Sequence, residues 1–242
     1  MKIDNQRKIG LIGGLSYAST LTYYKRLNEL VNQHYGQSHS AKIILESLDF
    51  QPIAAGLAEG NDRFVIAQLK HAAQTLERAG ADHIAMCCNT VHKFAPHIKN
   101  SLNIDLVNIC DCTAHWCADR DMQRVGLLGS AFTTGERFYK DAFTAVGIDV
   151  EVPALADRQF MQQAIETELS VGVIKPISRQ RFLNIAQELV KRGCDALILA
   201  CTEIPMIVHQ EDITIPVIDT VEVHCQAIVE RAIHIEQIEA LT

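Results

Sequence analysis

The feature that most constrains the fold is a pattern that occurs twice in the chain. IGLIGG at residues 9–14 is matched by VGLLGS at 125–130, and a Gly-to-Cys segment at 80–88 is matched by another at 193–201. The offsets are nearly equal, 116 residues (126 − 10) and 113 residues (201 − 88). Two matches at almost one offset indicate an internal duplication, with a period far too long for a solenoid. The chain is therefore expected to consist of two related halves.

Each copy of the second segment ends in a cysteine that follows an apolar run. In both copies a glycine lies eight residues before the cysteine (88 − 80 and 201 − 193), which identifies Cys88 rather than its neighbour Cys87 as the partner of Cys201. A single such cysteine would be interpreted as a buried core thiol. A thiol at a strand-to-helix turn, however, faces the helix N-terminus, where the dipole favours the thiolate. The repetition favours a functional pair.

Apolar runs alternate with helical patterns along the chain, which predicts an α/β fold with parallel sheets. We expect two pseudo-symmetric parallel-sheet α/β domains, and if the two halves face each other across a pseudo-twofold axis, the active site lies in the cleft between them. The first domain is predicted to comprise residues 1–112 and 218–242, and the second residues 113–217. A strand near residues 215–218 is expected to rejoin the first half, which would make the domains discontinuous.

Several local expectations follow from the same patterns. Residues 49–52 are expected to be a loop after a strand, residues 61–79 a long helix that Gly80 ends, and residues 129–134 a turn after a strand. A strand is predicted at 104–109, with the next helix beginning at Thr113. Ser16 or Ser19 is expected to cap the first helix.

Charge and composition exclude several classes of partner. The net charge is −7 and no basic stripe is present, so no nucleic acid is expected. No apolar run approaches the ~18 residues that a membrane span requires. The polar first eight residues are not typical of a secretory signal, and eight cysteines without such a signal indicate a reducing compartment. A cytoplasmic protein is predicted.

No cofactor or metal is predicted. The glycine-rich turn at residues 10–14 lacks the G-x-G-x-x-G spacing of a dinucleotide site. A cluster of possible zinc ligands at residues 110–117 lacks the paired spacing of a structural zinc site, and its thiols are expected to point in different directions. Lone histidines such as His83 and His224 are expected to be packed or capped, while His92 could lie one helical turn from Cys88.

Two opposed thiols suit one reaction particularly well. In open parallel sheets ligands bind beyond the carboxyl ends of the strands, where both cysteines are predicted to lie. If they flank one cleft, Cys88 and Cys201 can act on opposite faces of one carbon. One thiol, as thiolate, removes a proton and the other delivers a proton, so that the carbon is inverted.

The two motifs carry a family resemblance. CNTVH at residues 88–92 and CTEIP at 201–205 resemble the paired motifs of the aspartate/glutamate racemase family, and the match extends to residues 9–20 and 127–130. The resemblance implies racemisation of an acidic amino acid without pyridoxal phosphate, with Cys88 and Cys201 as the catalytic pair. It also implies a homodimer.

The resemblance places Asn89, Thr90 and Thr202 where the family binds the substrate's α-carboxylate and amine, and Glu203 is typical of the aspartate branch. The candidate substrate-binding residues are Ser16, Gln51, Asn89, Thr90, Ser130, Thr133, Thr202 and Glu203. Two cations that some aspartate racemases use for the side-chain carboxylate are absent here. The loop after the second strand has no Arg, and the Lys position falls near Ser170. Arg63 and Lys175 are the candidate replacements.

The predicted function is interconversion of L- and D-aspartate, or of glutamate, by a cofactor-independent racemase. A maleate-type cis–trans isomerase or decarboxylase of the same superfamily is the enzymatic alternative. A non-catalytic sensor of acidic metabolites would use the cleft but not the thiols. Solvent deuterium discriminates these possibilities, because only a racemase places it at Cα of an amino acid.

Overall fold

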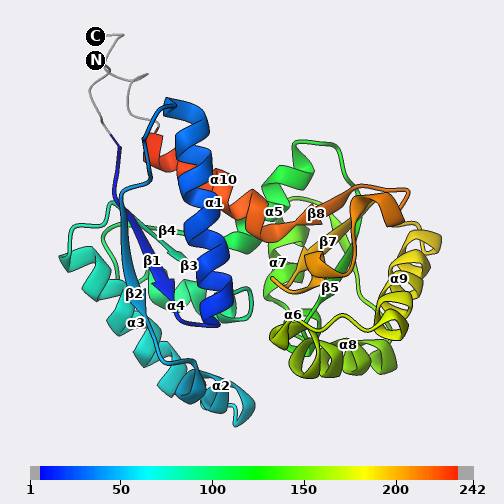
Figure 1. Cartoon of the computed structure of the whole chain (residues 1–242). Coiled ribbons are helices and arrows are strands. Elements are labelled where there is room, and N and C mark those ends of the chain that lie inside the picture. Colours follow the sequence, from blue (N-terminus) through cyan, green and yellow to red (C-terminus); the bar gives the residue numbers. More distant parts are fainter. Residues whose placement is uncertain (1–5, 234–242) are drawn as a thin grey trace. The chain divides into compact units, whose positions relative to one another are not determined.

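The computed structural model describes residues 6–233, which form two four-stranded parallel sheets surrounded by helices (Figure 1). The first sheet has the order β2-β1-β3-β4. Its strands are β1 (Ile9–Gly13), β2 (Ile43–Ser47), β3 (His83–Met86) and β4 (Asp105–Val107). The second sheet has the order β6-β5-β7-β8. Its strands are β5 (Arg124–Gly129), β6 (Asp149–Glu151), β7 (Ala196–Ala200) and β8 (Val217–Asp219). The predicted α/β class with parallel sheets is confirmed.

The two sequence repeats occupy equivalent places in the two sheets. IGLIGG lies on β1 and VGLLGS on β5, while the two cysteine segments lie on β3 and β7. In each sheet these are the two central strands, which pair in parallel with Ile12 opposite Met86 and Gly129 opposite Ala200. Central parallel strands are covered on both faces, which explains why their sequences are continuously apolar. The shared strand order agrees with the duplication inferred from the sequence.

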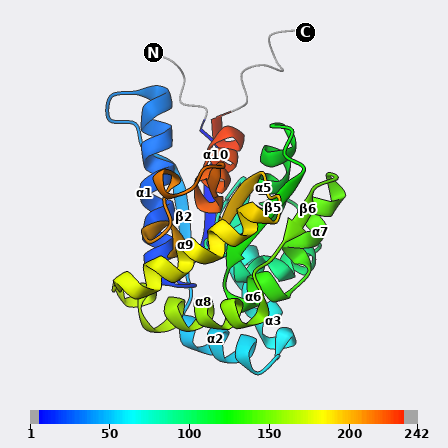
Figure 2. The same cartoon turned by 90° about the vertical axis from the view of Figure 1, so that its right-hand side faces the viewer.

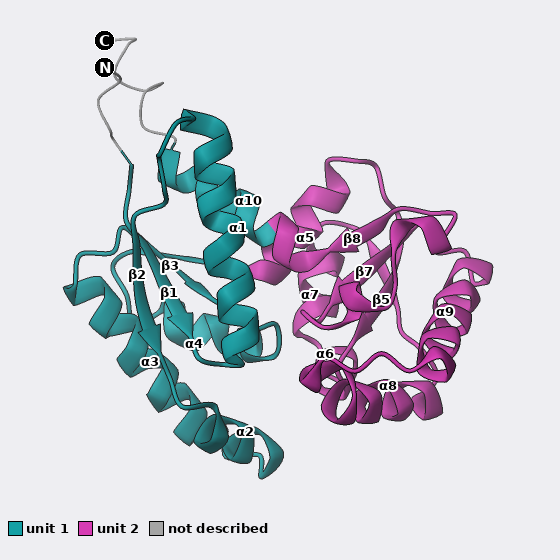
Figure 3. Ribbon diagram, in the orientation of Figure 1, with its two compact units in different colours: residues 1–108, 224–242 teal, residues 109–223 magenta. Residues whose placement is uncertain are grey.

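The chain divides into two compact units, residues 1–108 with 224–242 and residues 109–223 (Figure 3). The helices of the first unit are α1 (Tyr17–Tyr35), α2 (Phe50–Ala58), α3 (Asp62–Arg78), η1 (Thr90–Phe94), α4 (Ala95–Lys99) and most of α10 (Thr220–Ile233). Those of the second unit are α5 (Ile109–Ala118), α6 (Ala131–Gly135), α7 (Phe138–Ala145), α8 (Leu155–Thr167), η2 (Leu169–Val171), α9 (Pro176–Lys191), η3 (Ile204–Met206) and η4 (Gln210–Asp212). The domain limits inferred from the sequence, as limits of independently folding units, stay a prediction.

In the first unit, the long helix α3 shows how the sequence sets both ends of an element. The Asn61 side chain accepts a hydrogen bond from the backbone N–H of Phe64 at 3.3 Å, and Gly80, at φ +85°, follows the last turn. Apolar residues at helical spacing, including Leu69 and Leu76, are buried against the sheet. Burial of each such leucine stabilises the fold by about 1.5–3 kcal/mol. On α1, Tyr23, Leu27 and Val31 are buried, and α1 and α10 lie side by side (Figures 1 and 2).

The second unit shows the two-residue alternation expected of a strand covered on both faces. Leu197 and Leu199 of β7 belong to a core cluster with residues of α8 and α9, whereas Ile198 and Ala200 belong to a cluster with residues of α5 and α7. Successive side chains of a strand point to opposite faces, so each sheet face has its own core. Cys201 continues this alternation and packs against the cluster of α8 and α9.

Three local expectations were wrong. Residues 50–52 are not a loop but the first turn of α2, because Asp49 accepts the backbone N–H of Gln51 at 3.2 Å and Pro52 is tolerated in a first helical turn. Helix α5 begins at Ile109 rather than at Thr113, since its first residues are buried and apolar and therefore resemble a strand. Residues 131–135 form the short helix α6 instead of a simple turn.

Two further expectations need correction. The strand at residues 217–219 does not rejoin the first half, because β8 pairs with β7 in the second sheet, with Ile198 opposite Ile218. Ser16 precedes α1 but does not cap it with its side chain, and Ser16 has a positive φ of 78°. With ψ at 114°, this is a backbone conformation that residues with side chains rarely adopt, and the Ser16 hydroxyl does not bond the first helical N–H groups.

Candidate active site

Cys88 is the second residue after the carboxyl end of β3, on the face of the sheet that α3 covers. The side chains of Ile84 and Met86 belong to the core cluster of that face, and the partly exposed Cys88 packs against the same cluster. Cys87 points to the other face and is fully buried. Its N–H donates to the Ile12 carbonyl at 2.9 Å, and burial raises the pKa of its thiol well above the ordinary value. Of the two adjacent thiols, only Cys88 is accessible.

This geometry makes Cys87 a control for the neighbouring thiol. We expect Cys87→Ala to retain the turnover of the wild type, because its side chain is on the opposite face of the strand from Cys88. The loss of buried sulfur should lower the free energy of unfolding by about 1 kcal/mol. Urea unfolding and an activity assay check both expectations. An inactive Cys87→Ala enzyme beside a fully active Cys88→Ala enzyme would show that the wrong thiol has been chosen.

The turn after β1 is tied to this segment by hydroxyl groups. The Ser19 hydroxyl donates to the Cys87 carbonyl at 2.6 Å. The Thr20 hydroxyl accepts the Gly14 N–H at 2.9 Å and donates to the Ser16 carbonyl. Gly14 has φ +74°, and a Cβ at this position would lie 2.0 Å from the Leu48 carbonyl oxygen. The turn is thus closely packed, and it holds Ser19 beneath the thiol segment.

Asn89 and Thr90 follow Cys88 at the start of the 3₁₀-helix η1. Asn89 is buried and Thr90 is partly exposed. The Asn89 carbonyl accepts the His92 N–H at 3.1 Å, and the Nδ1 of His92 lies 2.8 Å from the Cys88 carbonyl oxygen. Gln51 is exposed in the first turn of α2, after the carboxyl end of β2. The first unit thus presents these residues after the carboxyl ends of its strands.

Cys201 occupies the equivalent place in the second unit, directly beyond β7. Its Sγ–H donates to Oε2 of Glu203 at 2.9 Å, and the Thr202 hydroxyl donates to the same oxygen at 2.7 Å. All three side chains are partly exposed. The thiol therefore contacts a carboxylate that can accept its proton, a contact not inferred from the sequence, where Glu203 was interpreted as a substrate ligand.

Ser130 and Thr133 lie at the carboxyl end of β5 in the same unit. The Ser130 hydroxyl accepts the Thr133 N–H at 3.2 Å and so caps α6, and the two hydroxyls are 3.1 Å apart. Thr133 is fully buried, whereas Ser130 is partly exposed. The Thr133 hydroxyl therefore lies inside the turn, in contact with the Ser130 hydroxyl, and of the two side chains only that of Ser130 reaches the surface.

The two candidate cations for a side-chain carboxylate differ in their surroundings. Lys175 donates to Oε1 of Glu168 at 3.2 Å, so its charge already has a partner. Arg63 is exposed in the first turn of α3. Neither residue extends from one of the segments that hold the thiols.

Other sequence features lie outside this arrangement. Cys110 and Cys117 of α5 are buried in a core cluster with Tyr139, and burial raises the pKa of Cys117 to about 12. Within residues 6–233, no group of three His, Cys, Asp or Glu side chains is arranged to hold a metal ion.

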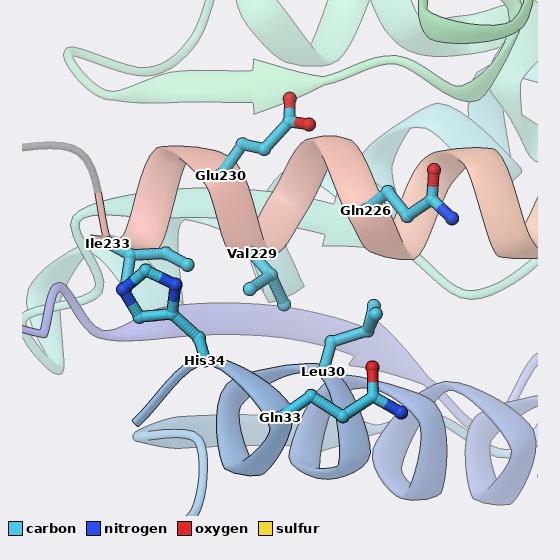
Figure 4. Close-up of a pocket in the computed structure, with 7 residues that line it drawn as sticks. All are labelled: Leu30, Gln33, His34, Gln226, Val229, Glu230 and Ile233. Carbon is cyan, nitrogen blue, oxygen red and sulfur yellow. The ribbon is translucent and has the colours of Figure 1, made fainter. Parts of the chain in front are cut away.

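A pocket between α1 and α10 contains none of the candidate site residues (Figure 4). It is lined by Leu30, Gln33, His34, Gln226, Val229, Glu230 and Ile233. In the same range, no helix has the length and apolar character needed to cross a bilayer.

Comparison with known proteins agrees with this arrangement. A family model described as Asp/Glu/Hydantoin racemase matches residues 12–228. A candidate Asp/Glu racemase from Yersinia pestis has a TM-score of 0.89 at 36% identity, covering 93% of this chain and 99% of that one. An aspartate racemase homologue from Pyrococcus horikoshii OT3 has a TM-score of 0.82 at 31% identity, with the same coverage of 93% and 99%. The broad specificity amino-acid racemase RacX of Bacillus subtilis (strain 168) is 24% identical over 218 residues, 88% of this chain and 92% of that protein.

Proposed function

Because the chain belongs to the Asp/Glu/Hydantoin racemase family, we propose that it interconverts L- and D-aspartate, or L- and D-glutamate, by proton transfer at Cα between two thiols. The chain is an amino-acid racemase, and the substrate and the role of the thiols are the new elements of the proposal. One observation supports it most strongly. Each of two units with the same strand order presents a partly exposed thiol at the carboxyl end of the same central strand.

In the proposed reaction, Cys88 and Cys201 act on opposite faces of the same Cα. One cysteine, as thiolate, takes the α-proton and becomes a thiol. The other, as thiol, gives its proton to the opposite face of the carbanion and becomes a thiolate. The product has inverted configuration and the two cysteines have exchanged protonation states. The next turnover in the same direction therefore requires the proton to return through solvent or a neighbouring group.

Glu203 is the neighbouring group that we assign to this return at Cys201. Its Oε2 accepts two hydrogen bonds, one from the Cys201 thiol at 2.9 Å and one from the Thr202 hydroxyl at 2.7 Å. A carboxylate in hydrogen-bond contact can take the proton when the thiolate is needed and return it afterwards. In this scheme Glu203 exchanges a proton with the Cys201 thiol, and the hydrogen bond from Thr202 orients the Glu203 carboxylate.

Cα of an amino acid is a very weak acid, so the site must stabilise the charge that develops on the substrate. Fixed donors near the α-carboxylate supply this stabilisation without reorganisation in the transition state. Asn89 and Thr90 are proposed as these donors because they immediately follow Cys88.

We expect Asn89→Ala and Thr90→Ala each to lower turnover by roughly 10- to 1,000-fold, the range for loss of one preorganised electrostatic contact. Initial rates of racemisation, followed by circular dichroism, measure the effect. Ala95→Gly on α4 offers a nearby control in which no donor is lost. Wild-type turnover in both the Asn89 and the Thr90 variant would remove these residues from the site.

The experiment that tests the proposed function is incubation in D₂O with a panel of substrates, followed by ¹H NMR and chiral chromatography. The panel contains aspartate, glutamate, neutral amino acids and maleate. Inversion with loss of the α-proton signal for aspartate or glutamate supports the proposal. Turnover of maleate alone would indicate the isomerase or decarboxylase alternative. Binding of the acidic amino acids without exchange would indicate a sensor, and racemisation restricted to neutral amino acids would contradict the proposed substrate.

A further inference from the structure

The backbone of Cys88 is held by a buried histidine. His92 is 1% exposed, and its Nδ1 lies 2.8 Å from the Cys88 carbonyl oxygen. Since a carbonyl only accepts hydrogen bonds, Nδ1 carries the proton. Burial lowers the pKa of His92 to about 4, so the ring is neutral at pH 7 and its Nε2 is an unprotonated acceptor. This Nε2 is buried and has no hydrogen-bond partner within residues 6–233.

A second buried histidine supports the first. The rings of His92 and His224 meet edge to face, with centroids 5.5 Å apart. Nε2 of His224 lies 2.9 Å from the Val107 carbonyl oxygen, and its Nδ1 lies 2.8 Å from the Tyr23 hydroxyl. Because the Val107 carbonyl is an acceptor, Nε2 carries the proton and Nδ1 accepts from Tyr23. Both nitrogens of His224 are therefore bonded, and burial lowers its pKa well below the ordinary value.

These contacts join four segments that are distant in sequence. Tyr23 lies on α1, His92 on η1, Val107 at the end of β4, and His224 on α10. The chain passes between its two units at 108/109 and at 223/224, so Val107 and His224 lie beside the two passages. The ring of His92 thus packs against a side chain, His224, whose two ring nitrogens are both hydrogen-bonded.

Packing alone does not explain the choice of histidine at position 92. An apolar side chain could fill the same core space without leaving a buried nitrogen unsatisfied, which costs free energy. Such a replacement would remove the hydrogen bond from Nδ1–H to the Cys88 carbonyl. Cys88 lies beyond Ala85–Val107, the last residue pair of β3 and β4.

We propose that His92 is a positioning residue, whose Nδ1–H fixes the Cys88 backbone and thereby the direction of its thiol, with His224 and Tyr23 holding the His92 ring. The inference rests on the proposed function, in which Cys88 is one of the two bases. The two thiols then have different supports. Cys88 is positioned by the hydrogen bond from His92 to its backbone carbonyl, whereas the Cys201 thiol is positioned by its hydrogen bond to the Glu203 carboxylate.

The test compares His92→Ala, His92→Asn and the matched control His83→Ala. His83 is another buried histidine of the first unit, at the opposite end of β3, and its ring nitrogens have no hydrogen-bond partner within the described range. Two readouts are used. One is kcat and KM for racemisation, and the other is the ratio of the iodoacetamide alkylation rates of Cys88 and Cys201, measured by mass spectrometry.

His92→Ala is expected to lower kcat about 10- to 100-fold, the effect of a small misplacement of a reacting group, with KM within about threefold of the wild type. The released segment should expose the half-buried Cys88, so that its alkylation rate relative to Cys201 rises at least about threefold. His92→Asn places an amide N–H near the former Nδ1 and should recover most of kcat. His83→Ala should leave kcat and the alkylation ratio within about twofold of the wild type, because no contact of the motif is lost.

Opposite changes in kcat and in Cys88 alkylation, with recovery in His92→Asn, support the positioning role. An unchanged alkylation ratio in His92→Ala, or equal effects of His92→Ala and His83→Ala, would overturn it. The alkylation readout does not require activity. If the wild type fails to racemise any acidic amino acid, the proposed function fails, and the alkylation ratio alone decides the role of His92.

Discussion

Removal of either thiol should abolish racemisation. In the proposed mechanism each face of Cα has one proton carrier, and neither solvent nor the remaining cysteine can replace it. We expect Cys88→Ala and Cys201→Ala each to lose about 10⁴-fold in turnover, the upper range for a positioned acid–base group. The double variant should be no worse than either single variant, because residues that act as a unit are not additive. Chiral chromatography of aspartate over hours measures the residual rate.

Two controls separate this effect from unfolding or from a general loss of thiols. Cys112→Ala removes another partly exposed thiol, on α5, and should keep the turnover of the wild type. Thermal unfolding should show that the Cys88 and Cys201 variants remain folded at the assay temperature. Normal turnover in one of the two catalytic variants would reduce the mechanism to a single base, and normal turnover in both would remove the thiols from the reaction.

Replacement of Glu203 by glutamine should have the next largest effect. The amide keeps the size of the side chain, but it has no negatively charged oxygen to accept the proton of the Cys201 thiol. In the wild type, the Cys201 Sγ lies 2.9 Å from Oε2 of Glu203. We expect Glu203→Gln to lower turnover about 100- to 1,000-fold, and Glu203→Asp to retain more activity because it keeps the charge. Glu211→Gln, on the exposed helix η4, is the matched control and should be silent.

The asymmetry between the two thiols must appear in exchange rather than in net turnover. The equilibrium constant of racemisation is one, so the kcat/KM values for the L and the D enantiomer must fall by the same factor in any variant. The exchange of the α-proton with solvent has no such restriction. In Glu203→Gln, exchange from the enantiomer that Cys201 deprotonates should therefore fall more than exchange from the other. Equal losses for both enantiomers would show that Glu203 does not act through Cys201.

The sequence contained enough information for the architecture because its strongest signals are local. Continuous apolar runs identify central parallel strands, and Gly80 and Gly193, at φ +85° and +84°, follow the helices before β3 and β7. The errors arose where one residue type serves two structures. Asp49 and Pro52 are typical of a loop, yet the same residues begin a helix as cap and first-turn proline. Buried Ile109 resembles the end of a strand, although it begins α5.

The candidate site was predictable in its positions but not in its contacts. The repeats identified the two cysteines, and the parallel fold placed them at the carboxyl ends of strands. The thiol-to-carboxylate bond of Cys201 depends on side-chain rotamers, which no pattern specifies. The bond between Tyr23 and His224 joins residues 201 positions apart, so nothing local distinguishes either residue from ordinary core. Both contacts depend on tertiary structure.

Solvent exchange in the two single-cysteine variants tests the two-base mechanism most directly. Cys88→Ala and Cys201→Ala are incubated separately with L- and D-aspartate in D₂O, and the α-proton is followed by ¹H NMR. Each variant is predicted to exchange the α-proton of only one enantiomer, with retention of configuration, and the two variants are predicted to act on opposite enantiomers. Exchange of both enantiomers by one variant, or the same preference in both variants, would contradict two thiols acting on opposite faces of Cα.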